Sequence, residues 1–192
     1  MKQDLAKLHH ARSKKDFPDL KLEENEYVEL AITRSKIILI FIWASAAACY
    51  AGLLVGSIFL NSPLASSFAG IAKSYMQMVI LILLGVITIA ALVATKVHFG
   101  NNLYVTNKRL IHHEMTSLFS KSVNVINLTS IEDVSFRQDN IVDYIFKLGT
   151  MRMSTVGDET TYTFKFVNTP HDELETITHL VHVEKENAKS KD

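Results

Sequence analysis

Two long runs without a charged residue constrain this chain more than any other feature. The first extends from Ile37 to Leu60 and the second from Ser74 to Thr95. A helix of about 20 apolar residues spans a hydrocarbon core of about 30 Å, so each run is long enough to cross a bilayer. A chain of 192 residues could hardly cover two helices that are apolar on all sides. We therefore predict two transmembrane helices, over about 37–60 and 74–96, that form a hairpin over 36–98.

Basic residues flank the two runs on the sides that lead to the chain ends. The segment that connects the runs holds only Lys73, and Lys96 follows the second run at once. The residues before the first run include Lys2, Lys7, Arg12, Lys14, Lys15, Lys21, Arg34 and Lys36. Positive charge accumulates on the cytoplasmic side of membrane helices. We predict a multi-pass protein of the cell (inner or plasma) membrane with both termini in the cytoplasm.

Small residues recur at every fourth position of the first run. Ala44, Ala48, Gly52 and Gly56 form a helix-packing stripe, and small side chains allow two helix backbones to approach closely. Two partners fit this stripe: the second helix of the same hairpin, or the same stripe of a second copy. We favour the second helix because it is already tethered nearby.

Charge and cysteine content exclude several classes of function. Lys plus Arg equal Asp plus Glu at 20 each, so net charge favours no nucleic-acid partner. Cys49 is the only cysteine, which excludes an internal disulfide and a cysteine-based zinc site. The two runs lack the charged residues that transporters keep at depth. We expect the hairpin to act as an anchor in membrane lipid.

Beyond Gly100 apolar and polar residues alternate, which is typical of β-strands. Turn residues follow the first strand at Asn107 and Lys108 and recur at Gly157 and Asp158. A short helical connection that ends at Gly149 interrupts the strands. The predicted strands lie over 102–106, 109–115, 121–131, 131–138, 149–156 and 160–167.

The pattern changes to a helical period after these strands. Thr169 and Pro170 suit the N-cap and first position of a helix, and an apolar stripe follows that needs a sheet to cover. The stripe consists of Leu174, Ile177 and Val181. The charged segment 184–192 is predicted to be disordered.

These elements predict an α+β domain over 99–183. The basic segment 1–35 before the first run is predicted to lie in the cytoplasm. Its first residues are either a short amphipathic helix on anionic lipid or a flexible tail, and we favour the tail. Residues 17–36, here called the lead-in, follow it, and their Tyr27, Leu30 and Ile32 fit a short ordered segment before the membrane.

Four stretches carry a resemblance to a known family: YVTNKRLI, VINLTSIEDVSFRQ, IFKLGTMRMSTVG and YTFKFVNTP, followed by a helix. They resemble the bacterial pleckstrin-homology (PH) family, which includes YdbS-like membrane proteins with two helices before the domain. The resemblance extends over about 17–183. It implies two bent antiparallel sheets that form a PH-like β-barrel, capped at one end by the last helix. It implies no enzyme.

No residue pattern indicates catalysis or a bound cofactor. His179 and His182, with Glu175 one turn earlier, are the only histidines spaced to share a metal on one helix face, and the His-Glu-x-x-His pattern is missing. The glycines make no phosphate-binding loop. We expect no catalytic residue, no metal ligand and no cofactor.

Two non-catalytic functions fit the sequence. The one we favour is a membrane-anchored module for protein interaction or self-assembly at the cytoplasmic face, with an unknown protein or a second copy as partner. The alternative is a reader of anionic lipid headgroups through the Lys108/Arg109 turn, with Lys121 as a third phosphate contact. An arginine in this turn also fits packing along the wall of the barrel, and we favour that role.

Overall fold

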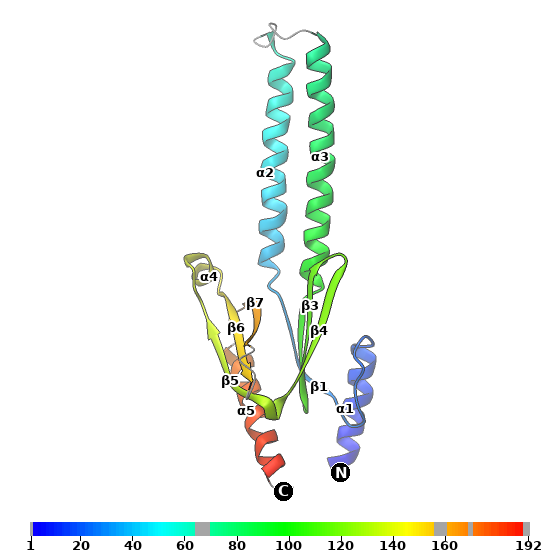
Figure 1. The fold of residues 1–192 in the computed structure, drawn as a ribbon, viewed down its shortest axis with the longest axis vertical. Helices are drawn as coiled ribbons and strands as arrows, with labels where there is room; N and C mark the ends of the chain where they lie inside the picture. Colours follow the sequence, from blue (N-terminus) through cyan, green and yellow to red (C-terminus); the bar gives the residue numbers. More distant parts are fainter. Residues whose placement is uncertain (1, 64–69, 156–160, 169–170, 190–192) are drawn as a thin grey trace. The chain divides into compact units, whose positions relative to one another are not determined.

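The computed structural model describes residues 2–63, 70–155, 161–168 and 171–189. The chain divides into two compact units (Figure 1). The first, here called the strand unit, consists of residues 1–35 and 99–192. The second, the helical hairpin, consists of residues 36–98. The turn predicted at Gly157 and the N-cap predicted at Thr169 and Pro170 lie outside the described residues.

The helical hairpin contains α2 (Ile37–Leu60) and α3 (Gly70–Phe99). Both helices are long and apolar enough to cross a membrane, over Ile37–Leu60 and Lys73–Phe99. Side-chain hydrogen bonds between described residues join them. The hydroxyls of Tyr50 and Thr88 lie 2.7 Å apart, and Gln77 Nε2 donates to Ser57 Oγ over 2.8 Å. The prediction of two long apolar helices is confirmed.

The helix-packing stripe does not face α3. Ala44, Ala48 and Gly52 are exposed, and a Cβ atom added at Gly52 or Gly56 would meet no heavy atom within 4 Å. The face that packs against α3 instead carries the buried Ala46 and the hydrogen-bonding Tyr50 and Ser57. The expectation that α3 packs on the stripe is therefore wrong, because the polar side chains find partners on the other face.

The strand unit contains two antiparallel sheets, one of four strands in the order β1-β2-β3-β4 and one of three in the order β5-β6-β7. The first sheet is built from β1 (Val28–Thr33), β2 (Asn102–Thr106), β3 (Arg109–Ser117) and β4 (Ser120–Asn127). The second is built from β5 (Ile131–Arg137), β6 (Leu148–Thr155) and β7 (Thr161–Asn168). The 3-10 helix η2 (Leu128–Ser130) connects β4 to β5, and α4 (Ile141–Ile145) connects β5 to β6.

The sheets form two layers rather than the closed barrel predicted from the resemblance. At one corner, Ser35 N, two residues beyond the end of β1, donates to Phe166 O on β7 over 2.8 Å. Phe166 has φ 63° and is the extra residue where the β6–β7 register shifts. A bulge of this kind bends its strand and breaks the ladder. The two sheets thus meet at this corner without continuous strand pairing.

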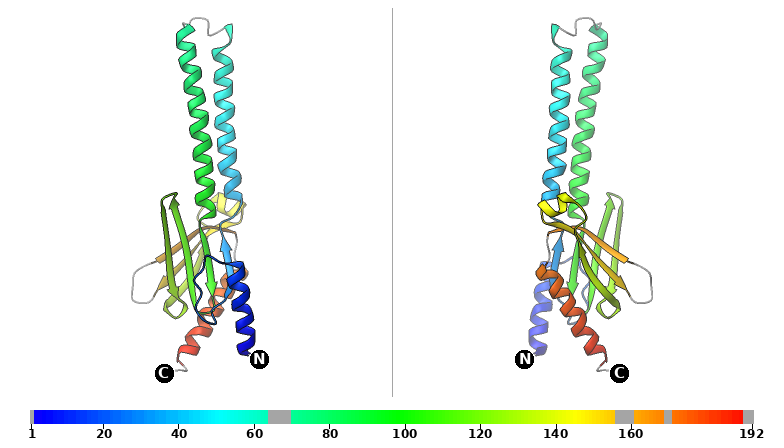
Figure 2. Two further views of the ribbon diagram at one scale, coloured as in Figure 1. Left: turned by 90° about the vertical axis from the view of Figure 1, so that its right-hand side faces the viewer. Right: turned by 90° about the vertical axis from the view of Figure 1, so that its left-hand side faces the viewer.

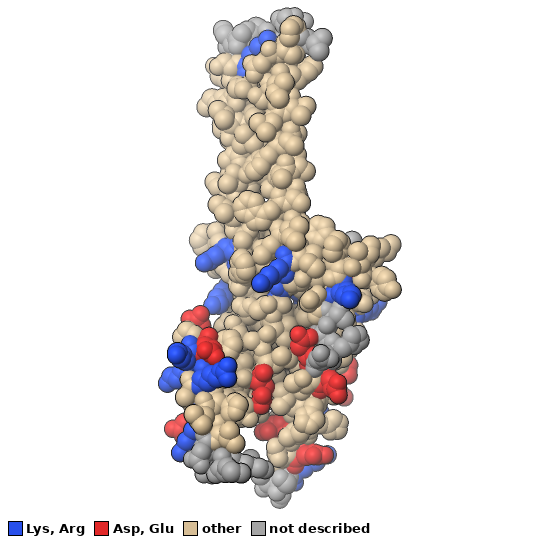
Figure 3. Space-filling view, turned by 180° about the vertical axis from the view of Figure 1, so that it is seen from behind, with Lys and Arg blue, Asp and Glu red and all other residues tan. Residues whose placement is uncertain are grey.

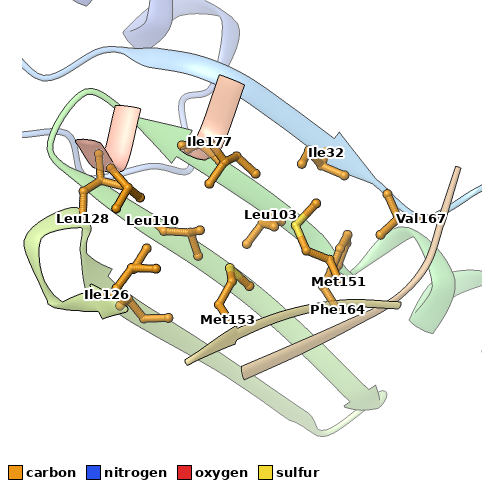
Figure 4. Packing of buried hydrophobic residues seen from close by; sticks show 13 residues of the cluster. Ile32, Leu103, Leu110, Ile126, Leu128, Met151, Met153, Phe164, Val167 and Ile177 are labelled. Carbon is orange, nitrogen blue, oxygen red and sulfur yellow. The ribbon is translucent and has the colours of Figure 1, made fainter. Parts of the chain in front are cut away.

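The core lies between the two sheets and α5 (His171–Lys189) (Figure 4). Ile177 and Val181 on α5 are buried in it, as the predicted apolar stripe requires. α5 continues through Lys189, so residues 184–189 are helical and not a disordered tail. The sheets contribute the buried Leu103, Val105, Leu110, Ile126, Ile131, Met151, Met153, Phe164 and Val167.

The segment before the hairpin is part of the strand unit. The α+β domain predicted from the sequence, 99–183, does not include it. β1 pairs with β2 along the edge of the first sheet, and its Ile32 side chain lies in the core. α1 (Lys2–Asp16) is also ordered: His10 Nδ1 lies 2.5 Å from Glu26 O, and Ser13 Oγ accepts from Val28 N over 3.0 Å. The favoured flexible tail is therefore replaced by a helix that the lead-in holds in place.

Candidate interaction groove

The predicted turn between β2 and β3 is fixed by hydrogen bonds to a buried carboxylate, that of Glu26. Glu26 is fully buried. Its carboxylate accepts hydrogen bonds of 2.8 Å from Arg109 Nε and Nη2, and others from Thr106 Oγ1 and Glu23 N, also at 2.8 Å. Two parallel N–H donors on one carboxylate form the strongest type of protein ion pair. The lead-in and the turn are thereby locked together.

Burial and hydrogen bonding act in opposite directions on this carboxylate. Burial raises the pKa of Glu26. The hydrogen bonds donated by Arg109, Glu23 N and Thr106 lower it by more than burial raises it, so the pKa lies below the ordinary value. The bonded carboxylate raises the pKa of Arg109. Glu26 is therefore ionised and Arg109 protonated throughout the neutral range.

The three predicted phosphate contacts do not form one cluster of free cations, because two of them are bonded within the protein. Arg109 is committed to Glu26 and also donates to Lys21 O over 2.9 Å. Lys108 Nζ lies 3.5 Å from a Glu23 carboxylate oxygen and donates to Glu24 O. Lys121 pairs with Met115, six residues along β3 from Arg109, which corresponds to roughly 20 Å. The turn thus lacks the set of free cations that a phosphate requires.

A groove of about 320 Å³ lies on the outer face of β3 and β4. Ile111, Val123 and Val125 form its apolar floor, and the segment Asp19–Lys21 forms one wall. Arg109, His113 and Lys121 also line it. The sequence singles out Lys121 and Arg109 but not the groove, because the wall and the floor are about 90 to 106 residues apart in the chain.

Neighbouring side chains of the lead-in fix the wall, Asp19–Lys21, against the sheet. The Phe17 ring contacts the Tyr104 ring edge-on at 5.3 Å between centroids, and Leu20 is buried. Tyr104 in turn contacts the His113 ring at 5.5 Å. Burial and Lys121 lower the pKa of His113, while Asp19 raises it. The groove therefore presents a neutral histidine between charges of both signs.

The far side of the groove is open. β4 is the edge strand of its sheet, and edge strands present unpaired backbone N–H and C=O groups. Val123 and Val125 are each 50% exposed on its outer face. Backbone donors and acceptors beside an apolar floor are what an extended peptide uses when it adds to a sheet.

The inner face of β3 carries a histidine that the sequence does not reveal as buried. His112 is 3% exposed, and its ring meets Phe164 edge-on at 5.3 Å. Among the described residues, neither of its ring nitrogens has a hydrogen-bond partner. Burial, and to a lesser extent Arg34 and His113, lower the pKa of His112, against the opposing effect of Glu114. A charged imidazole is thus disfavoured there.

No metal centre is present among the residues that the structure describes, since none of their His, Cys, Asp and Glu side chains form a group of three that could hold an ion. His179 and His182 lie on the helix α5, as predicted. Neither one lines the groove.

Comparison with known proteins identifies the family. The family model described as Bacterial PH domain matches residues 37–180, which include both apolar helices and most of the strand unit. No curated protein and no solved structure matches the chain. The match covers three quarters of the chain, and the two antiparallel sheets followed by a C-terminal helix agree with it. The chain belongs to the bacterial PH domain family.

Proposed function

We propose that the protein is a membrane-anchored, non-catalytic PH module that binds an extended segment of a protein partner, or of a second copy, at the cytoplasmic face of the membrane. The groove on β3 and β4 is the observation that supports this most. Its apolar floor lies beside the open edge of β4, so one peptide strand could pair with β4 and place a side chain on Val123 and Val125.

The electrostatics of the groove favour a peptide over a lipid headgroup. A phosphate needs several cations that are free to donate to it. Arg109 is already bonded to Glu26, and Asp19 places a negative charge in the wall beside Lys21. A peptide tolerates both signs because its backbone is neutral. The headgroup reader through Lys108 and Arg109 is therefore the weaker proposal.

Membrane anchoring rests on the two apolar helices. Their lengths match a bilayer, and a helical hairpin before the domain fits the YdbS-like arrangement. The positive flanks support cytoplasmic termini. Reporter fusions test this: an enzyme that is active only in the cytoplasm should work at either terminus and fail at Ser66. Activity of an external reporter at the C-terminus would exclude this topology.

A photoreactive amino acid at Val123 tests the groove in the full-length membrane protein. Irradiation of intact cells should give one or a few discrete adducts, and a product of twice the chain mass would indicate a second copy. Val125→Glu should abolish them by placing a charge on the apolar floor. Both valines are half-exposed, so the substitution should leave the fold intact.

The matched control carries the photoreactive residue at Val183 on α5, which is also partly exposed but lies outside the groove. Adducts that appear equally at Val183, or that persist in Val125→Glu, would count against the groove as the binding site. If no protein adduct forms and binding to anionic nanodiscs is lost in Lys108→Ala, the headgroup reader is favoured instead.

A further inference from the structure

Two loops of the strand unit carry large apolar side chains that are exposed. The β3–β4 turn presents Leu118 and Phe119, and Phe119 is 98% exposed. α4 presents Ile141, Tyr144 and Ile145, of which the least exposed is 63% exposed. These two loops are called the apolar tips. Large apolar side chains that gather on an otherwise polar surface usually mark a contact with a partner or with lipid.

The first tip lies beside the point where the chain leaves α3. Asn101, two residues beyond the end of α3, donates from Nδ2 to Met115 O over 2.9 Å and accepts from Met115 N over 3.2 Å. β3 continues past Met115 to Ser117, about 7 Å further along the strand. A Cβ atom on Gly100 would overlap the Met115 side chain. Within the strand unit, the β3–β4 tip therefore lies beyond Asn101, at the end of the sheet where β2 begins.

The second tip lies beside the point where the chain leaves for α2. Ser35 is the last residue of the strand unit before the hairpin, and its N–H bonds to Phe166 O on β7. The neighbouring Val167 pairs with Gly149 at the start of β6, directly after α4. Gln138 Nε2 closes the α4 loop by donating to Leu148 O over 2.8 Å. Within the strand unit, Figures 1 and 2 show both apolar tips at this same end.

Basic residues stand next to the apolar tips in the sequence. Lys121 follows Phe119 by two positions, and Arg137 and Lys147 bracket α4. On the face of the strand unit in Figure 3, Lys and Arg lie at the end that bears the tips, and Asp and Glu together with further Lys and Arg lie farther away. Exposed aromatic and aliphatic side chains flanked by cations are the composition of segments that lie in a membrane interface.

We propose that the two apolar tips insert into the interfacial layer of the bilayer that α2 and α3 cross, and so hold the strand unit against the membrane. The inference rests on the membrane anchoring proposed above. Covalent continuity favours lipid over a protein as the occupant, because Ser35 and Phe99 tether this end of the unit to the two apolar helices. The apolar side chains themselves recognise no particular headgroup, and the flanking Lys and Arg add a general attraction to anionic lipid.

Tryptophan fluorescence in proteoliposomes tests the proposal on the full chain. Trp43 is the only tryptophan and lies in α2, so the unaltered protein reports on the hairpin itself. Two further variants combine Trp43→Phe with Phe119→Trp or with Ile145→Trp, which report on the apolar tips. A fourth combines Trp43→Phe with Val183→Trp near the end of α5, as a control away from the tips. All four replaced side chains are at least partly exposed, so the variants should fold.

Brominated lipids should quench the tryptophans at positions 43, 119 and 145 and leave position 183 unquenched. Aqueous acrylamide should give the reverse order. If position 43 is quenched while 119 and 145 behave as 183 does, the hairpin is anchored and the tip proposal is wrong. If position 43 is not quenched, the anchoring fails and the tip proposal fails with it. If acrylamide fails to reach positions 119 and 145 while brominated lipids also leave them unquenched, a protein contact covers the tips and the proposal is overturned.

Discussion

Arg109 and Glu26 form a bidentate ion pair across 83 residues of sequence, with both contacts at 2.8 Å. The pair joins the lead-in before α2 to the first turn after α3. It gives Arg109 a structural role that excludes it from free contact with a phosphate. Because the Glu26 carboxylate is fully buried, its bonds to Arg109, Thr106 and Glu23 N replace the water that it loses on folding.

Arg109→Ala should strongly destabilise the strand unit. Loss of the guanidinium leaves a buried carboxylate without its main partner, a change that typically costs about 3–5 kcal/mol. Urea pulse proteolysis of the detergent-solubilised full chain measures the loss. Lys108→Ala is the matched control, because the Lys108–Glu23 contact is exposed and such pairs contribute about 0–1 kcal/mol. Equal effects of the two substitutions would contradict the structural role of Arg109.

Ile32→Ala should destabilise the strand unit even though Ile32 lies outside the predicted domain. Its side chain is 4% exposed in the core, and truncating a buried isoleucine to alanine costs about 2–5 kcal/mol. Thr33→Ala, on the exposed side of the same strand, should change stability by about 0.5 kcal/mol. The same proteolysis assay compares the two. An unaffected Ile32→Ala variant would mean that β1 is dispensable for the fold.

Gly52→Leu should leave the stability of the helical hairpin unchanged, because a side chain there meets open space. Ala46→Leu, in contrast, adds volume where Ala46 is buried between the helices, and overpacking costs about 1–3 kcal/mol. Thermal unfolding in mild detergent separates the two variants. Destabilisation of the hairpin by Gly52→Leu would contradict the observed helix faces. A change in oligomer size with intact hairpin stability would instead show that the stripe contacts a second copy.

His112→Leu should stabilise the strand unit and flatten its dependence on pH. Leucine removes two buried ring nitrogens that lack partners among the described residues, a gain of roughly 1–3 kcal/mol. The lowered pKa of His112 keeps the folded ring neutral. As pH falls through the ordinary value of 6.5, the unfolded chain binds a proton that the folded chain does not, so stability decreases.

Proteolysis between pH 7.5 and 5.5 tests this sign. The unaltered protein should lose stability on acidification, and His112→Leu should lose less. His179→Leu on α5 is the control, because His179 is exposed. A His112→Leu variant that is less stable at pH 7.5 would indicate that the ring makes a contact worth more than its burial costs.

The sequence by itself determined the local elements. Both helices of the hairpin, the strands around Asn107 and Lys108 and the apolar stripe of α5 follow from periods of 3.6 and 2 and from turn residues, which act over a few positions. The end of the short helix before β6 differs from the prediction because of a tertiary contact. Lys147, not Gly149, takes the left-handed conformation after α4 with φ 52°, because Gly149 is needed where a Cβ would overlap the Phe136 ring.

Only the tertiary structure decided the contacts between residues that are far apart in the sequence. Three features join the lead-in to residues that follow the hairpin in the sequence. They are the pairing of β1 with β2, the Arg109–Glu26 pair, and the groove that Asp19 and Val125 line. No local pattern reports such a contact. The corner at Phe166 also depends on a distant partner, the Ser35 N–H. The face of α2 that packs against α3 was decided in the same way, since the hydrogen bond between Tyr50 and Thr88 forms only on folding and outweighed the spacing of small residues.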